Sequence, residues 1–257
     1  METEVKLVVA CHKPYWHCAD PVYCYVEAGA ALHNMLMPNM LHDNTGDQIS
    51  EKNETFCELT VLYWAWKNLK EAYLGLCHYR RFFAKRRPGS RWKRILTGDE
   101  LKKYLKNTDV ILPKKRHYWI ETNYSQYIHA HHREDLDTTR RILEKVCPEY
   151  LSAYDRSMAR TSGHRFNMLL MKRELLNSYC TWLFDILFRL EAELDISQYS
   201  PKDRRVFGYV SERLLDVWLE TNRISYRELP VVNLERQNWL KKGGMFLFRK
   251  LRGSGTR

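Results

Sequence analysis

The chain has 257 residues, of which 44% are hydrophobic and 28% charged; this composition can bury a core and excludes disorder, collagen and coiled coil as the dominant class. It contains 42 Lys and Arg residues against 31 Asp and Glu residues, a formal net charge of +11, and its isoelectric point is about 9.3. This balance suggests an anionic partner, which is nucleic acid, lipid headgroups or a phosphorylated substrate.

The predicted elements alternate between strands and helices along the chain. Short apolar runs predict buried strands at Val5–Ala10, Ala72–Cys77, Asp109–Pro113 and His164–Met171. Helical spacing and a capping sequence at Thr97 predict helices at Glu54–Leu69, Thr97–Leu105, Thr138–Val146, Glu149–Met158, Arg173–Leu194 and Phe207–Thr221. The residues between the first strand and residue 50 are predicted to be mostly loop. The alternation predicts an α/β fold with a mostly parallel central sheet, whose ligand site lies at the carboxyl ends of its strands.

The cellular compartment is predicted from cysteines and apolar runs. No apolar run is long enough to span a membrane, and the acidic N-terminus is not that of a signal peptide. Seven cysteines at irregular spacing, without a Cys-x-x-Cys pair, favour a reducing compartment over a disulfide framework. We therefore expect a cytoplasmic protein.

Polar side chains directly follow the second predicted strand: His78, Tyr79, Arg80 and Arg81. Arginine forks match phosphate oxygens bidentately, and an imidazole adds a hydrogen-bond donor or a proton. The alternative is that the arginines are surface cations and the histidine is a hydrogen-bonded loop residue. Their position directly after a buried strand favours a binding site.

A second polar cluster, His129–Asp137, concentrates three imidazoles and three carboxylates. Its spacing matches neither a His-x-x-x-His helix face nor a Cys/His finger, so a metal site is not favoured. We expect Glu134, Asp135 or Asp137 to act as a general base while the histidines of the cluster, His131 and His132 among them, hydrogen-bond the substrate. The alternative is a polar helix entry capped by one of the aspartates.

Other candidate positions carry weaker signals. Gly163, between a serine and a histidine, would let a ligand approach the backbone closely, beside His164 and Asn167. Glu212, near the start of the last predicted helix, either contacts substrate or neutralises a buried arginine. Asp47 belongs to a turn that is either a cation loop or purely structural. The P-loop, Gly-x-Ser-x-Gly and Gly-x-Gly-x-x-Gly motifs are absent from the sequence, which removes the commonest NTPase, hydrolase and dinucleotide-binding functions.

The C-terminal segment differs from the rest because it interleaves aromatic residues with cations between residues 238 and 252. Such a segment lies on an anionic membrane surface, or it is a packed final strand with a solvated tail. We therefore divide the chain into a domain over residues 1–235 and a basic aromatic tail over residues 236–257.

Two strings carry a family resemblance: Cys57–Asn68 (CELTVLYWAWKN) and Leu74–Phe82 (LGLCHYRRF). They resemble a bacterial family long catalogued only as a domain of unknown function, whose members occur among capsular, exopolysaccharide and lipopolysaccharide O-antigen biosynthesis proteins and are treated as glycosyltransferases. Further similar blocks follow the family order between about residues 5 and 235: Asp43–Ser50, Ile111–Lys114, Tyr124–Tyr127, Arg160–His164 and Phe207–Leu215.

The resemblance implies a GT-A-like, Rossmann-type single domain. It also implies sugar transfer from a UDP-hexose, with UDP-galactofuranose preferred, to a saccharide or lipid-linked acceptor of capsule or O-antigen synthesis. GT-A enzymes commonly carry Asp-x-Asp after the strand that here ends at Cys77, where this chain has His78-Tyr79-Arg80. We infer that cationic side chains replace the usual divalent metal, and we expect neither a metal nor another cofactor.

The expected mechanism is an inverting displacement in which Asp135 or Glu134 deprotonates the acceptor hydroxyl and His78 with the adjacent arginines neutralises the departing diphosphate. Donor-binding residues are expected to be His12, Lys13, Asp47, His78, Tyr79, Arg80, Arg81, Gly163, His164 and Asn167. Acceptor-binding residues are expected to be Tyr124, His131, His132 and Glu212. The tail would place the protein at the inner face of the plasma membrane.

Two functions of other classes compete with this one. A nucleic-acid-binding protein or nuclease is suggested by the net charge and by Tyr79 among arginines, but the sequence has no helix-turn-helix, zinc finger or RNA-recognition motif. A non-catalytic scaffold that uses only the basic tail on a membrane is the other alternative. Nucleic acid is the least expected of the anionic partners.

Overall fold

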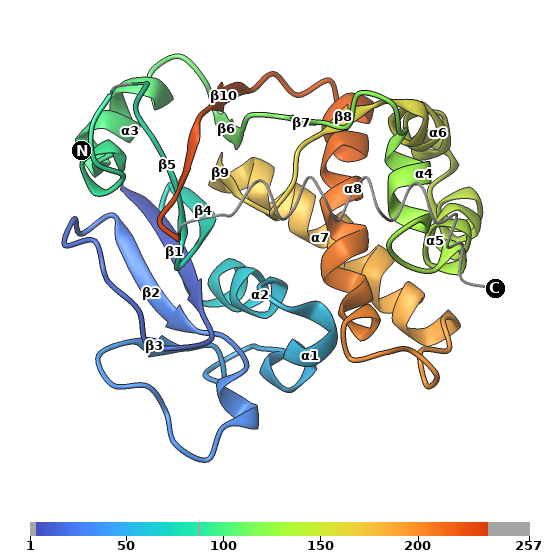
Figure 1. Ribbon diagram of the computed structural model, residues 1–257, viewed down its shortest axis with the longest axis horizontal. Coiled ribbons are helices and arrows are strands. Elements are labelled where there is room, and N and C mark those ends of the chain that lie inside the picture. The colour runs from blue at the N-terminus through green and yellow to red at the C-terminus, as the bar shows by residue number, and fades with distance from the viewer. Residues whose placement is uncertain (1–3, 87, 236–257) are drawn as a thin grey trace.

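The computed structural model describes residues 4–86 and 88–235. Its centre is a nine-stranded sheet whose main path runs in the order β10-β6-β9-β4-β1-β2-β3 (Figure 1). The strands on this path are β1 (Val5–Cys11), β2 (Tyr23–Glu27), β3 (Leu41–His42), β4 (Tyr73–His78), β6 (Val110–Pro113), β9 (Leu169–Lys172) and β10 (Arg227–Leu229).

Most neighbouring strands on this path are parallel. β1 pairs in parallel with β2 and β4, β2 with β3, and β6 with β10. Only β9 runs against its two neighbours, between β4 and β6. After β4 the chain turns back into β5 (Arg81–Phe83), which pairs with β11 (Val231–Asn233). The expected α/β fold with a mostly parallel sheet is thereby confirmed.

Eight α-helices complete the described part of the fold: α1 (Asn53–Phe56), α2 (Leu59–Asn68), α3 (Gly98–Leu105), α4 (Asn123–Ile128), α5 (Arg133–Val146), α6 (Leu151–Ala159), α7 (Arg173–Glu193) and α8 (Val206–Thr221). Figure 1 shows α4, α5 and α6 on the far side of α8 from strands β1 to β3. A short pair of strands, β7 (Arg116–His117) and β8 (Ser162–Gly163), lies beside α8.

The core occupies both faces of the sheet. Along β1, Val8 and Ala10 belong to the cluster that contains the large helices, whereas Leu7, Val9 and Cys11 belong to a second cluster on the other face. This alternation follows from the two-residue period of a strand, and it explains why β1 reads as a continuous apolar run.

The segment predicted as one helix, Glu54–Leu69, forms two helices, α1 and α2. Cys57 has a φ of 54°, a left-handed conformation that ends α1 and lets α2 start at Leu59. The periodicity of the apolar residues continues across this break, so the sequence pattern conceals it. The break places Glu58 at the entry to α2.

The predicted strand His164–Met171 is wrong in its first half. Phe166 and Asn167 have φ values of 77° and 51°, which a strand does not accommodate, so β9 begins only at Leu169. The predicted helix that starts at Thr138 instead begins at Arg133, because its polar first turn lacks the apolar residues on which the periodicity depends.

The region predicted as mostly loop contains β2. This strand ends at Glu27, whose side chain is fully buried. A buried carboxylate interrupts the apolar pattern by which a short strand is detected. Among the described residues no helix combines the length and apolarity that crossing a membrane requires. The predicted tail, residues 236–257, lies outside the described residues.

Candidate active site

A cleft of about 870 Å³ opens where β1 and β4 end and where the turn before β9 faces α8. Arginines dominate its lining: Arg80, Arg81, Arg116, Arg165, Arg204, Arg205 and Arg213. The acidic residues of the lining are Glu54, Glu58 and Glu212. The cleft therefore attracts anions, and it lies at the carboxyl edge of the parallel strands, where α/β folds bind ligands.

The tight turn between β4 and β5 presents two arginines that differ in their partners. Arg80 donates a hydrogen bond of 2.7 Å from Nη1 to Glu235 Oε2. Arg81 lies with its guanidinium carbon 4.4 Å from the centre of the Phe166 ring, and it has no hydrogen bond or ion pair within the described residues. Burial lowers the pKa of Arg81, yet a guanidinium remains charged at neutral pH. Arg81 is thus a cation with free donors inside the cleft.

The arginines contributed by other elements fall into two groups. Arg165 and Arg213 hold the site together: Arg165 donates to Tyr118 Oη at 2.9 Å, and Arg213 donates to Gln126 Oε1 at 2.8 Å. Arg205, at the start of α8, donates from Nε to the Cys57 thiol at 3.1 Å and leaves its two terminal amino groups free of hydrogen bonds to described residues. Arg205 and Arg81 therefore offer unused donors to a ligand.

Glu58 is a half-buried cleft carboxylate with one unoccupied oxygen. Its Oε1 accepts a hydrogen bond of 2.8 Å from Asn167 Nδ2 and lies 3.8 Å from His78 Nε2. Its Oε2 has no hydrogen-bond partner in the described part of the chain. Asn167 is held in turn by Ser211 Oγ at 2.9 Å and by the Gly208 carbonyl at 3.1 Å. This network fixes Glu58 while leaving one oxygen available for chemistry.

The other carboxylates are less suited to accept a proton. Glu212 Oε1 accepts from the Phe166 amide at 3.0 Å and Oε2 accepts from Arg213 at 2.9 Å, so both of its oxygens are occupied. Of the two alternatives for Glu212, the neutralisation of a buried arginine is therefore observed, and the side chain also lines the cleft. Glu54 is exposed at the margin of the cleft.

The histidines of the cleft are biased toward the neutral form. Burial lowers the pKa of His78, although Glu58 opposes the shift, and the ring contacts the Phe166 carbonyl. Burial also lowers the pKa of His12, with the cations around it acting in the same direction. Burial lowers the pKa of His131 to about 4. At neutral pH the positive charge of the cleft comes from its arginines.

Many of the residues predicted from sequence line the cleft. His12, His78, Tyr79, Arg80, Arg81, His131 and Glu212 do so. Lys13 lies beside it, with Nζ 3.6 Å from Glu235 Oε1 and 5.3 Å from the centre of the Tyr79 ring. Asn167 stands behind Glu58 rather than on the surface of the cleft.

The two predicted general bases, Asp135 and Glu134, do not line the cleft. Asp135 is 1% exposed, and its two oxygens accept hydrogen bonds of 2.7 Å from Tyr127 and Tyr199. Burial raises the pKa of Asp135. Glu134 lies on the outer face of α5, where it binds Arg141 at 2.6 Å. Neither carboxylate lines the cleft, because α5 begins at Arg133 and turns Asp135 inward to the tyrosines.

Several other predicted site residues have structural partners outside the lining. Asp47 accepts a hydrogen bond from Tyr63 Oη at 3.1 Å on an exposed turn. His164 is buried, with Nδ1 2.6 Å from Asp216 Oδ1. A Cβ on Gly163 would lie 2.5 Å from Arg165 Nη1, so this glycine makes room for an arginine rather than for a ligand.

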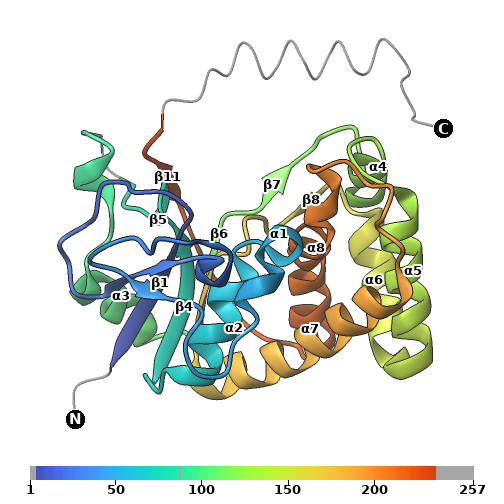
Figure 2. The same ribbon diagram turned by 90° about the horizontal axis from the view of Figure 1, so that it is seen from below.

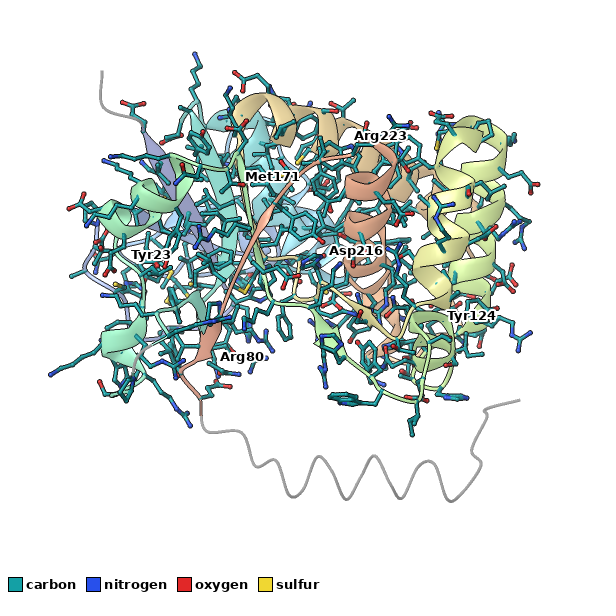
Figure 3. The ribbon with its side chains drawn as sticks, turned by 90° about the horizontal axis from the view of Figure 1, so that it is seen from above. Tyr23, Arg80, Tyr124, Met171, Asp216 and Arg223 are labelled. Carbon is teal, nitrogen blue, oxygen red and sulfur yellow. The ribbon has the colours of Figure 1, made fainter. Side chains whose placement is uncertain are left out.

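The predicted acceptor residues Tyr124 and His132 also lie outside the lining. Tyr124 donates to Asp137 at 2.7 Å, and His132 stacks on Tyr199 at 3.9 Å between ring centres. Figure 3 shows Arg80 on the sheet side of α8 and Tyr124 on the other side. Within residues 4–86 and 88–235, no group of three or more His, Cys, Asp or Glu side chains is placed to hold a metal ion.

Sequence reasoning missed Glu58, Arg165 and Arg205. Glu58 stands inside the string CELTVLYWAWKN, but it lies next to apolar residues that read as one helix. Arg205 follows Arg204 directly before α8, a pair of cations at a helix start that resembles the Arg80-Arg81 pair after a strand. The similarity of these two arginine pairs is the feature of the sequence that could have indicated Arg205 as a site residue.

Residues 6–223 match the family described as a domain of unknown function, DUF4422. The chain belongs to this family. The predicted resemblance to a family described as a domain of unknown function is thereby confirmed.

The structure of this DUF4422 protein is similar to that of WbbM, described as a bifunctional glycosyltransferase in its apo form, with a TM-score of 0.84 and 27% sequence identity. The similarity covers 91% of this chain and 46% of the WbbM chain, so the present protein spans about half the length of that one. It supports the GT-A-like character of the fold. No curated protein matches the chain.

Proposed function

We propose that this DUF4422 protein is a glycosyltransferase. In this proposal it transfers a hexose from a UDP-sugar to a saccharide or lipid-linked acceptor in the synthesis of capsule or O-antigen polysaccharide. The observation that carries the proposal is the arginine-rich cleft at the carboxyl edge of the sheet, with the unpaired Arg81 at its floor. The similarity to WbbM over most of this chain supports it.

The donor diphosphate would bind between Arg81 and Arg205, because their unused guanidinium donors match phosphate oxygens. His12, Lys13 and Tyr79 would flank the nucleoside beside the end of β1. UDP-galactofuranose is the preferred donor on the strength of the family resemblance alone.

We assign the general base to Glu58. Its free Oε2 would take the proton of the acceptor hydroxyl as that oxygen attacks the anomeric carbon. The bond between the anomeric carbon and the diphosphate breaks, and the UDP leaves with the electron pair, its charge stabilised by Arg81 and Arg205. Attack opposite the leaving group inverts the anomeric configuration. Asn167 positions Glu58 through the hydrogen bond to Oε1.

We propose that the reaction needs no divalent metal. This proposal rests on the resemblance, in which His78-Tyr79-Arg80 stand after β4 in place of the Asp-x-Asp of GT-A enzymes, and on the arginines of the cleft lining. Turnover should therefore be unchanged by EDTA, measured as UDP release. Loss of turnover with EDTA and its recovery with Mn²⁺ or Mg²⁺ would contradict this part of the proposal.

A thermal-shift panel tests the function itself. UDP and UDP-sugars should raise the melting temperature of the wild-type protein and leave that of the Arg81→Gln variant nearly unchanged. Salt-sensitive stabilisation by oligonucleotides alone would favour the nucleic-acid-binding alternative. The absence of any response to UDP compounds in the wild-type protein would remove the proposed donor site.

A further inference from the structure

Large apolar side chains are exposed on three loops near the cleft. Trp119 is 85% exposed and Ile120 is 64% exposed on the loop between β7 and α4, next to Tyr118 of the cleft lining. Trp16 and Trp92 are each 42% exposed on the side of β1 and β5. Figure 2 shows β5, β11 and β7 along one edge of the molecule. We call these four side chains together the rim.

The backbone at Trp119 holds the indole outward at a cost. Trp119 has a φ of 63°, and the Ile120 amide donates a hydrogen bond of 2.7 Å to the Tyr118 carbonyl. This is a γ-turn with positive φ at its centre, a rare and strained geometry. The Tyr118 amide, which donates to the Thr161 carbonyl at 2.8 Å, anchors the turn to the fold. A strained turn that presents an indole to solvent points to a ligand for that indole.

On the other flank two indoles contact each other. The Trp16 and Trp92 rings lie with their centres 4.3 Å apart at 60°. Trp16 follows β1, and Trp92 begins a short 3-10 helix, Trp92–Arg94. The contact joins the loop after β1 to the basic loop after β5, so the two indoles form a continuous apolar patch.

The sequence around both patches is rich in cations, of which Lys85 is paired with Glu100 at 2.6 Å. In sequence, residues 85–94 contain six Lys and Arg residues and no acid, and residues 114–120 contain three and no acid. Lys93 and Lys114 are exposed and have no partner within the described ranges. The next acid along the chain after residue 120 is Glu121, whose Oε1 lies 2.6 Å from His129 Nδ1.

We propose that the rim docks on an anionic phospholipid bilayer, so that the cleft opens toward the membrane surface. Indoles insert at the headgroup level of a bilayer, and lysines attract anionic headgroups. Ile120 favours lipid over a saccharide, because a branched aliphatic chain does not stack on a sugar ring. Membrane docking of the rim does not depend on the proposed function. Its consequence, that the acceptor is lipid-linked, rests on the proposed function.

Vesicle co-sedimentation of the full-length protein tests this proposal. Wild-type protein should bind vesicles of phosphatidylcholine mixed with phosphatidylglycerol, in a salt-sensitive way, and should bind pure phosphatidylcholine weakly. The double variants Trp119→Asn with Ile120→Ser, and Lys93→Gln with Lys114→Gln, should each lower the partition coefficient at least about tenfold. Asparagine is chosen at 119 because it tolerates positive φ.

Two control variants match these changes elsewhere. Met35→Ser removes an 86% exposed apolar side chain from the loop between β2 and β3. Lys103→Gln with Lys106→Gln removes two exposed cations near the end of α3, which leads to the amino end of β6. Both should bind anionic vesicles within about twofold of the wild-type protein, since only a general charge or hydrophobicity effect would move them.

Several outcomes would overturn the rim. The proposal is contradicted if both rim double variants bind vesicles as well as the wild-type protein does, or if the control variants lose vesicle binding equally. It is also contradicted if the wild-type protein shows no preference for anionic vesicles, or if the rim variants lose binding to a soluble polysaccharide and keep binding to vesicles. A UDP thermal shift equal to that of the wild-type protein would show that the variants are folded. Retained UDP binding without vesicle binding contradicts the rim alone, whereas vesicle binding without any UDP response contradicts the proposed function alone.

Discussion

Arg80 and Arg81 are adjacent in sequence and read as equivalent phosphate ligands, yet they have different surroundings. The turn after β4 directs Arg80 to Glu235, with which it forms an ion pair of 2.7 Å. Arg81 is the first residue of β5 and lies against Phe166 without an anionic partner in the described residues. A partly buried cation without an ion pair can bind an anionic ligand without losing an existing partner. Replacing Arg81 therefore tests phosphate binding more directly than replacing Arg80.

Replacing Arg81 by Gln should weaken UDP binding by about tenfold to a hundredfold. Charge-assisted hydrogen bonds contribute roughly 1.5–3 kcal/mol each. Titration calorimetry with UDP measures the change. Arg81→Lys should recover only part of the affinity, because a lysine offers no fork. The exposed Arg86→Gln serves as the control, and equal UDP affinities for Arg81→Gln and wild type would refute the role of Arg81.

Replacing Glu58 by Gln should lower kcat by about a hundredfold to ten-thousandfold, because the amide no longer accepts the acceptor proton. UDP affinity should stay near that of the wild-type protein. Asp135→Asn is the matched comparison: it should retain kcat and lose stability, since this carboxylate is buried between two tyrosines. A normal kcat in Glu58→Gln, together with a collapsed kcat in a folded Asp135→Asn protein, would restore the original assignment.

Among the elements, the junction between α1 and α2 depends on a buried carboxylate. Asp43 accepts hydrogen bonds from the Gly29 amide at 2.9 Å, the Ala30 amide at 3.0 Å and Thr60 Oγ1 at 2.6 Å, and it also contacts Ser50 Oγ. It thereby ties the end of β2 to the first turns of α2. Glu58 stands immediately before α2, so this tie also supports the geometry of the cleft.

Asp43→Asn should destabilise the protein by about 2–4 kcal/mol, because the new amide group presents hydrogens to donors that need an acceptor. Urea unfolding followed by circular dichroism measures the loss. The exposed Asp185, paired with Arg189 one turn away on α7, provides the control Asp185→Asn, which should change the midpoint little. Equal midpoints for Asp43→Asn and wild type would show that the network does not hold the junction.

The prediction of elements succeeded where the pattern is local and failed where a single residue bends the chain. Helix α7 was predicted within a residue of its bounds because its apolar residues recur over many turns. The breaks at Cys57 and Asn167 leave no mark on that periodicity. Both residues adopt positive φ and are held by contacts from α8 and the residue before it: Arg205 bonds the Cys57 thiol, and Ser211 with Gly208 holds Asn167.

At the scale of the whole molecule, the buried histidines couple stability to pH. His131 lies with Nδ1 3.1 Å from Asp203 Oδ1 and stacks on Tyr209. Burial lowers its pKa to about 4, below the value of about 6.5 in an unfolded chain. Between these values the unfolded state binds the extra proton. The contribution of His131 to stability is therefore complete above about pH 6.5 and is lost progressively as the pH falls toward 4.

His131→Gln should flatten this dependence. The wild-type protein should lose roughly 1–2 kcal/mol more stability than the variant between pH 7 and pH 5. Urea unfolding at the two pH values, in one buffer of constant ionic strength, measures both slopes. The glutamine amide retains a donor for Asp203, so the variant should remain folded. Parallel pH profiles for the two proteins would show that His131 does not titrate in this window.

The sequence by itself determined the α/β alternation, the positions of β1, β4, β6, α7 and α8, and the family, because each depends on local patterns of apolar residues or on contiguous strings. Only the tertiary structure decided which polar side chains share the cleft. Along the chain Asp135 reads as a candidate base and Glu58 as part of one continuous helix. In the structure α5 turns Asp135 into the core, whereas Glu58, directly after the break at Cys57, lines the cleft with the arginines. The direction of a side chain depends on packing between segments far apart in sequence, and composition carries no record of that packing. The net charge of +11 likewise does not say where the cations lie. In the structure some of them line the cleft and others lie near the rim.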